Sequence, residues 1–293
     1  MFYSHPSRRK DSIPDSLLYS LKTEEVGVSE VKTAVFDGGE MDYISFGRGK
    51  KTFVILPGLS VHSVLGLRDA VEKAYAAFTE EYTVYLFDNT KNMGEGYTIS
   101  TLADDTARAM KALGISGADV LGVSMGGMMA IYLTSRHPEL VHKLILASTA
   151  SRVNDTFRTF GSVLLEKAEK RDAEGLLGAF ADYVYSEKSN ALYRDAFIDA
   201  NRGITDVEYS RLCVLIRACL GYDASEELKG IKCPVLVIGS EGDSVVTAEA
   251  SREIASALGC RLHLYDSSYG HAVYDEAPDY KKRCLDFLIQ NNR

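Results

Sequence analysis

The sequence predicts an α/β fold built on a mostly parallel sheet, and three observations lead to this prediction. Short apolar runs of strand type alternate with longer amphipathic segments, an order typical of parallel strands joined by crossover helices. One apolar run ends directly in Gly-x-Ser-x-Gly, as it would at a sharp strand-to-helix turn. Between residues 151 and 230 the apolar runs stop and helical periodicity replaces them.

The first two strands are predicted to form an antiparallel hairpin. Residues 31–36 and 41–46 alternate in polarity, and the turn sequence Asp37-Gly38-Gly39 lies between them. The later strands are short and apolar, as in a buried parallel sheet. We place them at residues 52–56, 83–88, 118–123, 143–147, 235–239 and 261–265.

Helices are predicted from a spacing of apolar residues close to 3.6. Among the strands, they span residues 64–78, 99–113, the segment from the serine turn to 136, 248–258 and 280–290. In the stretch without strands, they span residues 160–170, 173–185, 192–201 and 206–220. We therefore expect an N-terminal extension (1–29), a first part of the core (30–150), a helical insertion (151–230) and a second part of the core (231–293).

Composition and charge restrict the class of protein. The 293 residues include 33 Lys and Arg and 41 Asp and Glu, so the net charge is −8. An acidic balance argues against a general nucleic-acid or anionic-membrane surface. No apolar run reaches the 18 residues that a membrane span needs, and the N-terminus does not resemble a secretory signal.

The five cysteines point to a reduced environment. They are odd in number and widely spaced, and they form neither a Cys-x-x-Cys pair nor a metal-like cluster with histidines. We expect free thiols, no metal and a cytoplasmic location.

The serine at the strand-to-helix turn is the candidate nucleophile. Gly122 and Gly126 lie two residues before and after Ser124, where side chains would strike the neighbouring strand and helix. The turn also places Ser124 at a helix N-terminus, whose free N–H groups can stabilise an oxyanion. The N–H of Met125 is the natural donor.

A serine nucleophile needs a base and a carboxylate that orients the base. His271 is the best of the six histidines, because it lies in a loop between the last strand and the last helix. Asp243 follows the penultimate strand and is the preferred carboxylate, with Glu241 and Asp266 as alternatives. Ser124, Asp243 and His271 each lie just past a predicted strand, in the chain order Ser, Asp, His.

With these motifs, the chain from about residue 30 to 291 resembles the α/β-hydrolase fold superfamily, specifically members with a helical cap inserted after the sixth strand. The resemblance implies a mostly parallel, eight-stranded sheet flanked by helices. Gly122-Val123-Ser124-Met125-Gly126-Gly127 is similar to the nucleophile elbow, Gly242-Asp243-Ser244 to the acid loop and Gly270-His271 to the histidine loop. The resemblance implies that Ser124 is the nucleophile and that His271 acts first as base and then as acid. It also implies that Asp243 orients His271.

The resemblance also implies a second oxyanion donor after the third strand. Relatives carry a His-Gly pair there, and this chain has Pro57-Gly58, so the backbone N–H of Leu59 takes the role without the histidine. Haloalkane dehalogenases and epoxide hydrolases of this fold use an aspartate nucleophile. Serine at position 124 and the lack of tryptophan argue against both activities.

These observations predict a cofactor-free serine hydrolase with a small-molecule acyl substrate. An ester or lactone is the first expectation and a thioester the next. An acyltransferase, or a ligand receptor on the same fold, is the alternative, since a fold does not determine a function. The cap should roof an acyl pocket, where Tyr183, Tyr185 and Tyr209 either contact substrate or only pack the helices; no oligomeric state is predicted.

Overall fold

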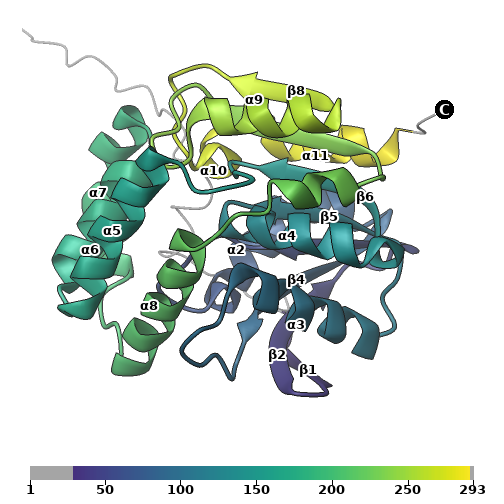
Figure 1. Ribbon diagram of the computed structural model, residues 1–293, viewed down its shortest axis with the longest axis horizontal. Coiled ribbons are helices and arrows are strands. Elements are labelled where there is room, and N and C mark those ends of the chain that lie inside the picture. The colour runs from purple at the N-terminus through teal and green to yellow at the C-terminus, as the bar shows by residue number, and fades with distance from the viewer. Residues whose placement is uncertain (1–28, 291–293) are drawn as a thin grey trace, which may run out of the picture.

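The computed structural model describes residues 29–290, which form a central sheet with helices on both faces and a further group of helices at one end (Figure 1). The predicted N-terminal extension, residues 1–29, lies outside the described residues except for Ser29.

Eight strands form a single sheet in the order β1-β2-β4-β3-β5-β6-β7-β8. Their bounds are β1 (Lys32–Phe36), β2 (Gly39–Phe46), β3 (Lys51–Leu56), β4 (Tyr82–Thr90), β5 (Ala118–Val123), β6 (Val141–Ala147), β7 (Val235–Ser240) and β8 (Arg261–Tyr265). The β1–β2 and β2–β4 pairs are antiparallel, and all other neighbours are parallel. The predicted fold class, including the opening hairpin, is confirmed.

Helices cover both faces of the sheet. They are η1 (Val64–Leu67), α2 (Arg68–Ala74), η2 (Ala76–Phe78), α3 (Ile99–Ala112), α4 (Met125–Arg136), η3 (Pro138–Leu140), η4 (Glu226–Gly230), α9 (Thr247–Leu258), α10 (Val273–Glu276) and α11 (Tyr280–Ile289). The strand β3 shows how the two faces are divided. Val54 and Leu56 belong to the apolar core under α3, α4 and α9, whereas Phe53 and Ile55 belong to the core under η2 and α11. Alternate side chains of a buried strand therefore hold both layers in place.

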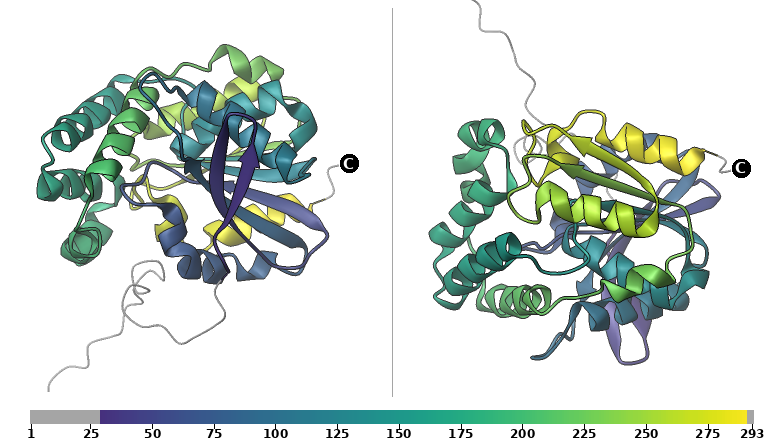
Figure 2. Two further views of the ribbon diagram at one scale, coloured as in Figure 1. Left: turned by 90° about the horizontal axis from the view of Figure 1, so that it is seen from below. Right: turned by 45° about the horizontal axis from the view of Figure 1, so that its top comes forward.

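Four further helices lie between β6 and β7. They are α5 (Asp155–Glu169), α6 (Ala173–Val184), α7 (Glu187–Ala200) and α8 (Asp206–Leu220). Both views in Figure 2 show them as a separate group beyond one end of the sheet. Helix α5 packs against α6 and α8, and the Phe160 ring meets the Phe180 ring edge-on at 6.1 Å. The helical stretch that interrupts the α/β pattern thus has its own packed interior.

Two of these helices begin earlier than the apolar spacing predicts, and side-chain caps explain the difference. The Asn154 side chain accepts a hydrogen bond from the Phe157 N–H, so α5 begins at residue 155 rather than 160. Ser186 caps α7 in the same way, and that helix begins at residue 187 rather than 192. A cap adds a polar first turn that apolar periodicity does not detect.

The helix predicted over residues 64–78 is wrong as a single element. The segment consists of α2 between two 3₁₀ turns, η1 and η2. Its buried side chains, Leu65, Tyr75 and Phe78, lie at or beyond the ends of α2, and α2 itself buries no residue. The 3₁₀ turns carry Leu65 and Phe78 into the core, and Tyr75 reaches it from the junction between α2 and η2.

Within residues 29–290 no helix combines the length and the apolar character that crossing a membrane requires. All five cysteines are free, and three of them, Cys213, Cys219 and Cys284, are buried.

Candidate active site

Ser124 occupies the junction between β5 and α4 in a strained backbone conformation. Its φ of 52° and ψ of −118° are unusual for a residue with a side chain. A Cβ atom at Gly126 would lie 2.1 Å from the carbonyl oxygen of Leu56, and one at Gly122 would lie 2.6 Å from the oxygen of Gly126. The two glycines therefore let the turn press against β3 and against its own helix.

Two hydrogen bonds connect this turn to β6 and to the residues just after it. The Ser124 N–H donates to the carbonyl of Ala147 (2.9 Å), and the Ser124 carbonyl accepts from the Thr149 hydroxyl (2.8 Å). Gly127 leaves room for Thr149, since a Cβ there would lie 2.6 Å from its side chain. The strained serine is thus fixed by β6 and by the residues just beyond it.

The structure brings Ser124, His271 and Asp243 into one hydrogen-bonded chain. His271 Nε2 lies 2.9 Å from Ser124 Oγ, and His271 Nδ1 lies 2.8 Å from Asp243 Oδ2. All three residues are at most 9% exposed. Each follows the carboxyl end of a parallel strand, namely β5, β7 or β8, and these ends meet at one edge of the sheet.

The surroundings of Asp243 favour its ionised form. The second carboxylate oxygen, Oδ1, accepts the N–H groups of Val245 (2.8 Å) and Val246 (3.0 Å). Burial raises the pKa of this carboxyl, but the charge and hydrogen bond of His271 and the two N–H groups outweigh burial and leave the pKa below its usual value. An ionised Asp243 accepts the Nδ1 proton, so Nε2 presents its lone pair to the serine hydroxyl.

The two alternative carboxylates lie elsewhere. Glu241 pairs with Arg252 on α9, and Asp266 accepts bonds from the backbone and hydroxyl of Ser268. Among the described residues, neither contacts His271, whose Nδ1 partner is Asp243.

The predicted oxyanion donors flank the serine. Met125 is the first residue of α4, and Leu59 follows Gly58, where a Cβ atom would lie 3.3 Å from Ser124 Cβ. In the described part of the chain, neither the Leu59 nor the Met125 N–H donates to a protein acceptor. Two backbone donors without partners beside a serine hydroxyl are suited to bind a developing negative charge.

The loop after β3 is also joined to the insertion. His62 Nδ1 lies 2.7 Å from Glu208 Oε1, and Arg211 Nη2 lies 2.5 Å from Asp88 Oδ1 at the end of β4. Glu208 and Arg211 are one turn apart on α8. The sequence alone gives none of these four residues a role, because no local pattern pairs segments so far apart in the chain.

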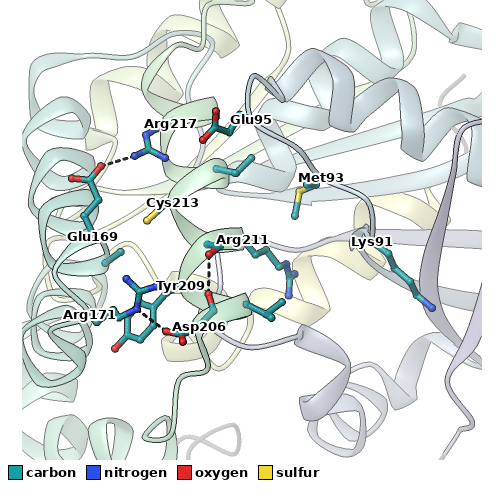
Figure 3. Close-up of a pocket in the computed structure, with 14 residues that line it drawn as sticks. Lys91, Met93, Glu95, Glu169, Arg171, Asp206, Tyr209, Arg211, Cys213 and Arg217 are labelled. Carbon is teal, nitrogen blue, oxygen red and sulfur yellow. Dashed lines mark hydrogen bonds and ion pairs between the residues drawn. The ribbon is translucent and has the colours of Figure 1, made fainter.

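The three tyrosines named from the sequence have different surroundings. The Tyr183 carbonyl accepts a hydrogen bond from the Ser244 hydroxyl in the acid loop, and the Tyr185 ring packs edge-on against Phe197. Tyr209 lines a hollow of about 660 Å³ between α5, α8 and residues 91–95 (Figure 3). Ser124, Asp243 and His271 do not line this hollow, so it is not the predicted acyl pocket.

The charged groups of the hollow largely neutralise one another. Arg171 pairs with Asp206, and Arg217 pairs with Glu169, as the dashed lines in Figure 3 show. Within residues 29–290 no group of three or more His, Cys, Asp and Glu side chains is arranged to hold a metal ion.

Comparisons with known proteins identify a family model and relatives that this chain resembles. A family model described as alpha/beta hydrolase fold matches residues 51–278. One relative is RutD of Caulobacter sp. (strain K31), which is provisionally named a carbamate hydrolase. It is 26% identical over 72% of this chain and 82% of its own length. The hydrolase YcgS of Bacillus subtilis (strain 168), which is uncharacterized, is 26% identical over 88% of this chain and 98% of its own.

Solved structures show the same fold. MGS-M2, an alpha/beta hydrolase enzyme from a Medee basin deep-sea metagenome library, superposes with a TM-score of 0.80 at 20% identity, covering 89% of this chain and 98% of its own. The enol-lactonase from Burkholderia xenovorans LB400 superposes with a TM-score of 0.72 at 25% identity, covering 88% of this chain and all of its own.

Proposed function

The chain belongs to the α/β-hydrolase fold family, and we propose that it is a serine hydrolase that cleaves small carboxylic esters, lactones or thioesters through an acyl-enzyme. The observation that carries this proposal is the hydrogen-bonded chain from Asp243 through His271 to Ser124. A serine hydroxyl is a weak nucleophile unless a base accepts its proton, and this chain supplies such a base.

The proposed reaction has two halves. Ser124 Oγ attacks the substrate carbonyl carbon while His271 Nε2 takes the hydroxyl proton, and the same proton passes to the departing alcohol, enol or thiol as the tetrahedral intermediate collapses. Water then gives a proton to His271 and attacks the acyl-enzyme, which releases the acid and restores the serine. Asp243 keeps the imidazole oriented and stabilises its charged form throughout.

The Leu59 and Met125 N–H groups are proposed to hold the oxyanion of both tetrahedral intermediates. They lie on backbone that the strand β3 and the start of α4 fix, so little reorganisation is needed during the reaction. Loss of one such donor costs about 10²–10³ in turnover in related chemistry. No cofactor or metal has a role in this mechanism.

The reaction centre and two of the similar proteins support the proposed substrate class. Lactones are supported by the likeness to a protein named as an enol-lactonase, which is 25% identical. The likeness to RutD adds carbamates to the compounds that should be tested. We further propose that α5–α8 form a cap over the acyl group, because Tyr183 and Val184 on α6 accept hydrogen bonds from the acid loop and the histidine loop.

A panel of activated esters, lactones, thioesters and carbamates, with acyl chains of increasing length, tests the proposal. Wild-type protein should hydrolyse at least one class, and Ser124→Ala should lower its kcat by about 10⁶. Ser256→Ala, on the exposed face of α9, is the matched control and should keep full activity. A Ser124→Ala protein that keeps most of the wild-type turnover would refute the proposal, and transfer of the acyl group to an added alcohol in preference to water would identify an acyltransferase instead.

A further inference from the structure

One glutamate joins the histidine loop to the helical insertion. Glu276 is the last residue of α10, and its Oε2 accepts the N–H of Gly270, the residue before His271, at 2.6 Å. Its Oε1 accepts both the N–H (2.9 Å) and the hydroxyl (2.7 Å) of Ser186. Ser186 is the N-cap of α7 and lies 90 residues before Glu276, so a single carboxylate connects the histidine loop to the start of a distant helix.

The two backbones that Glu276 connects are in close contact. A Cβ atom at Gly270 would lie 2.6 Å from the Ser186 nitrogen and 2.7 Å from the carbonyl carbon of Tyr185. On the other side of His271, the N–H of Ala272 donates to the carbonyl of Val184 (2.9 Å). The α6–α7 corner, defined here as residues 183–186, therefore contacts the residues directly before and after the imidazole.

The same corner reaches the acid loop. The Ser244 hydroxyl donates to the carbonyl of Tyr183 at 2.8 Å, and Ser244 is the residue after Asp243. Both partners in the hydrogen bond between His271 and Asp243 are thus adjacent to residues that the α6–α7 corner holds.

We propose that Glu276 is a positioning residue for His271, and that it couples the orientation of the imidazole to the helical insertion. The kinetic tests of this inference rest on the proposed function, because they need a substrate that the protein hydrolyses. His271 lies outside any helix or strand, so its two short contacts, to Ser124 and Asp243, depend on how its loop is fastened. Misplacement of a reacting group by about 1 Å can cost about 10²-fold in rate.

The chemistry of the three contacts selects a carboxylate of this length. Each carboxylate oxygen faces N–H or O–H donors, and an ionised carboxylate accepts with both oxygens. A glutamine would turn an NH₂ group toward one set of donors, and an aspartate would be one methylene too short to bridge both segments. The change from Glu276 to Gln therefore breaks one side of the bridge with almost no change in volume.

The test compares kcat and KM for wild type, Glu276→Gln and a matched control, Glu253→Gln. Glu253 also lies on a helix and also loses a carboxylate contact, an ion pair to Arg152, but among the described residues it bonds to none of the histidine loop. We expect Glu276→Gln to lower kcat by about 10–100-fold with KM changed less than about threefold. Glu253→Gln should leave both unchanged. A Glu276→Gln protein with wild-type kcat, measured well below its Tm, would overturn the inference, since a purely structural role predicts only a lower Tm.

A milder pair of variants covers the case in which Glu276→Gln fails to fold. Ser186→Ala removes the hydroxyl donor to Glu276 together with the cap bond that this hydroxyl accepts from the Ser189 N–H, and Ser186→Thr keeps a hydroxyl for both. We expect kcat to fall about two- to fivefold in Ser186→Ala and to be restored in Ser186→Thr, because two of the three donors to the Glu276 carboxylate remain in Ser186→Ala. Equal kcat in wild type and Ser186→Ala would contradict the coupling between α7 and the base.

The proton on His271 Nδ1 gives a measurement that needs no turnover. In wild-type protein its hydrogen bond to buried Asp243 should give a resolved downfield proton resonance, and Glu276→Gln should shift or broaden that signal. If wild type hydrolyses nothing, the proposed function fails but this resonance still tests the positioning role. An identical resonance in folded wild type and Glu276→Gln would overturn it.

Discussion

His62 Nδ1 lies 2.7 Å from Glu208 Oε1, and this contact joins the loop that carries Leu59 to helix α8 of the insertion. The other ring nitrogen, Nε2, lies 3.0 Å from the carbonyl oxygen of Asn201. Both nitrogens therefore face acceptors, an arrangement that suits the doubly protonated imidazolium.

The first prediction concerns the pH dependence of this contact. Burial lowers the pKa of His62, but its hydrogen bonds to Glu208 and the Asn201 carbonyl outweigh burial and raise the pKa above the usual 6.5. A raised pKa in the folded state means that the contact contributes its full stability below pH 6.5 and loses it as pH rises through the folded-state pKa. Since both side chains are partly exposed, the contribution should stay under about 1 kcal/mol.

Thermal unfolding of wild type and His62→Gln across a pH series measures this effect. The difference in Tm between the two proteins should be largest near about pH 5.5 and small near about pH 8.5. A difference that is constant over this range, or that grows with pH, would show that His62 is not protonated in the contact.

The second prediction identifies the carboxylate that orients His271. Asp243→Asn should fold normally and lower kcat by about 10⁴, because an amide can donate to Nδ1 and stabilise the wrong imidazole tautomer. Asp266→Asn serves as the control, since that carboxylate bonds only to Ser268 among the described residues. Steady-state kinetics of both variants check the assignment. Comparable losses in the two would remove Asp243 from its proposed role.

The third prediction concerns the close packing of the serine turn against β3 at Gly126. In Gly126→Ala the new methyl group would lie 2.1 Å from the Leu56 carbonyl oxygen, so the turn or β3 must shift. We expect a loss of about 3 kcal/mol or more in the free energy of unfolding. Gly66→Ala places a methyl group in open space at an ordinary φ and should change stability by less than about 0.5 kcal/mol. Urea denaturation distinguishes the two, and equal stabilities would mean that the turn can relax.

The fourth prediction concerns the ion pair between α8 and β4. Arg211 and Asp88 are only 20% and 10% exposed in their side chains, and Asp88 also accepts from the Ser63 hydroxyl at 2.5 Å. Arg211→Met leaves the carboxylate half-paired and should cost about 2 kcal/mol. Arg202→Met breaks a pair in which both side chains are 67% exposed and should cost less than about 0.5 kcal/mol. Calorimetry measures the stability of both variants. Equal losses would show that the ion pair between Arg211 and Asp88 does not stabilise the contact between the insertion and the sheet.

Much of the architecture could be predicted from the sequence because it depends on local patterns. Apolar runs of strand length predict the six parallel strands, and alternating polarity predicts the two of the opening hairpin. Parallel strands share one carboxyl edge. Residues that follow those strands, such as Ser124, Asp243 and His271, are therefore expected to lie near one another. The structure places them in one hydrogen-bonded chain.

The contacts that the sequence did not predict depend on tertiary structure. Glu276 bonds Ser186 across 90 residues and His62 bonds Glu208 across 146, and no local sequence pattern predicts either contact. The break of the predicted helix at residues 64–78 has a related cause. Periodicity identifies an apolar face, but the depth to which Leu65 and Phe78 must reach is set by the sheet beneath them.

The central claim is that Ser124 is an activated nucleophile, and covalent labelling tests it most directly. Folded wild-type protein, treated with a fluorophosphonate and weighed intact by mass spectrometry, should gain the mass of one adduct. Ser124→Ala should gain none under the same conditions. An adduct that persists in Ser124→Ala, or a folded wild-type protein that remains unlabelled, would contradict the account.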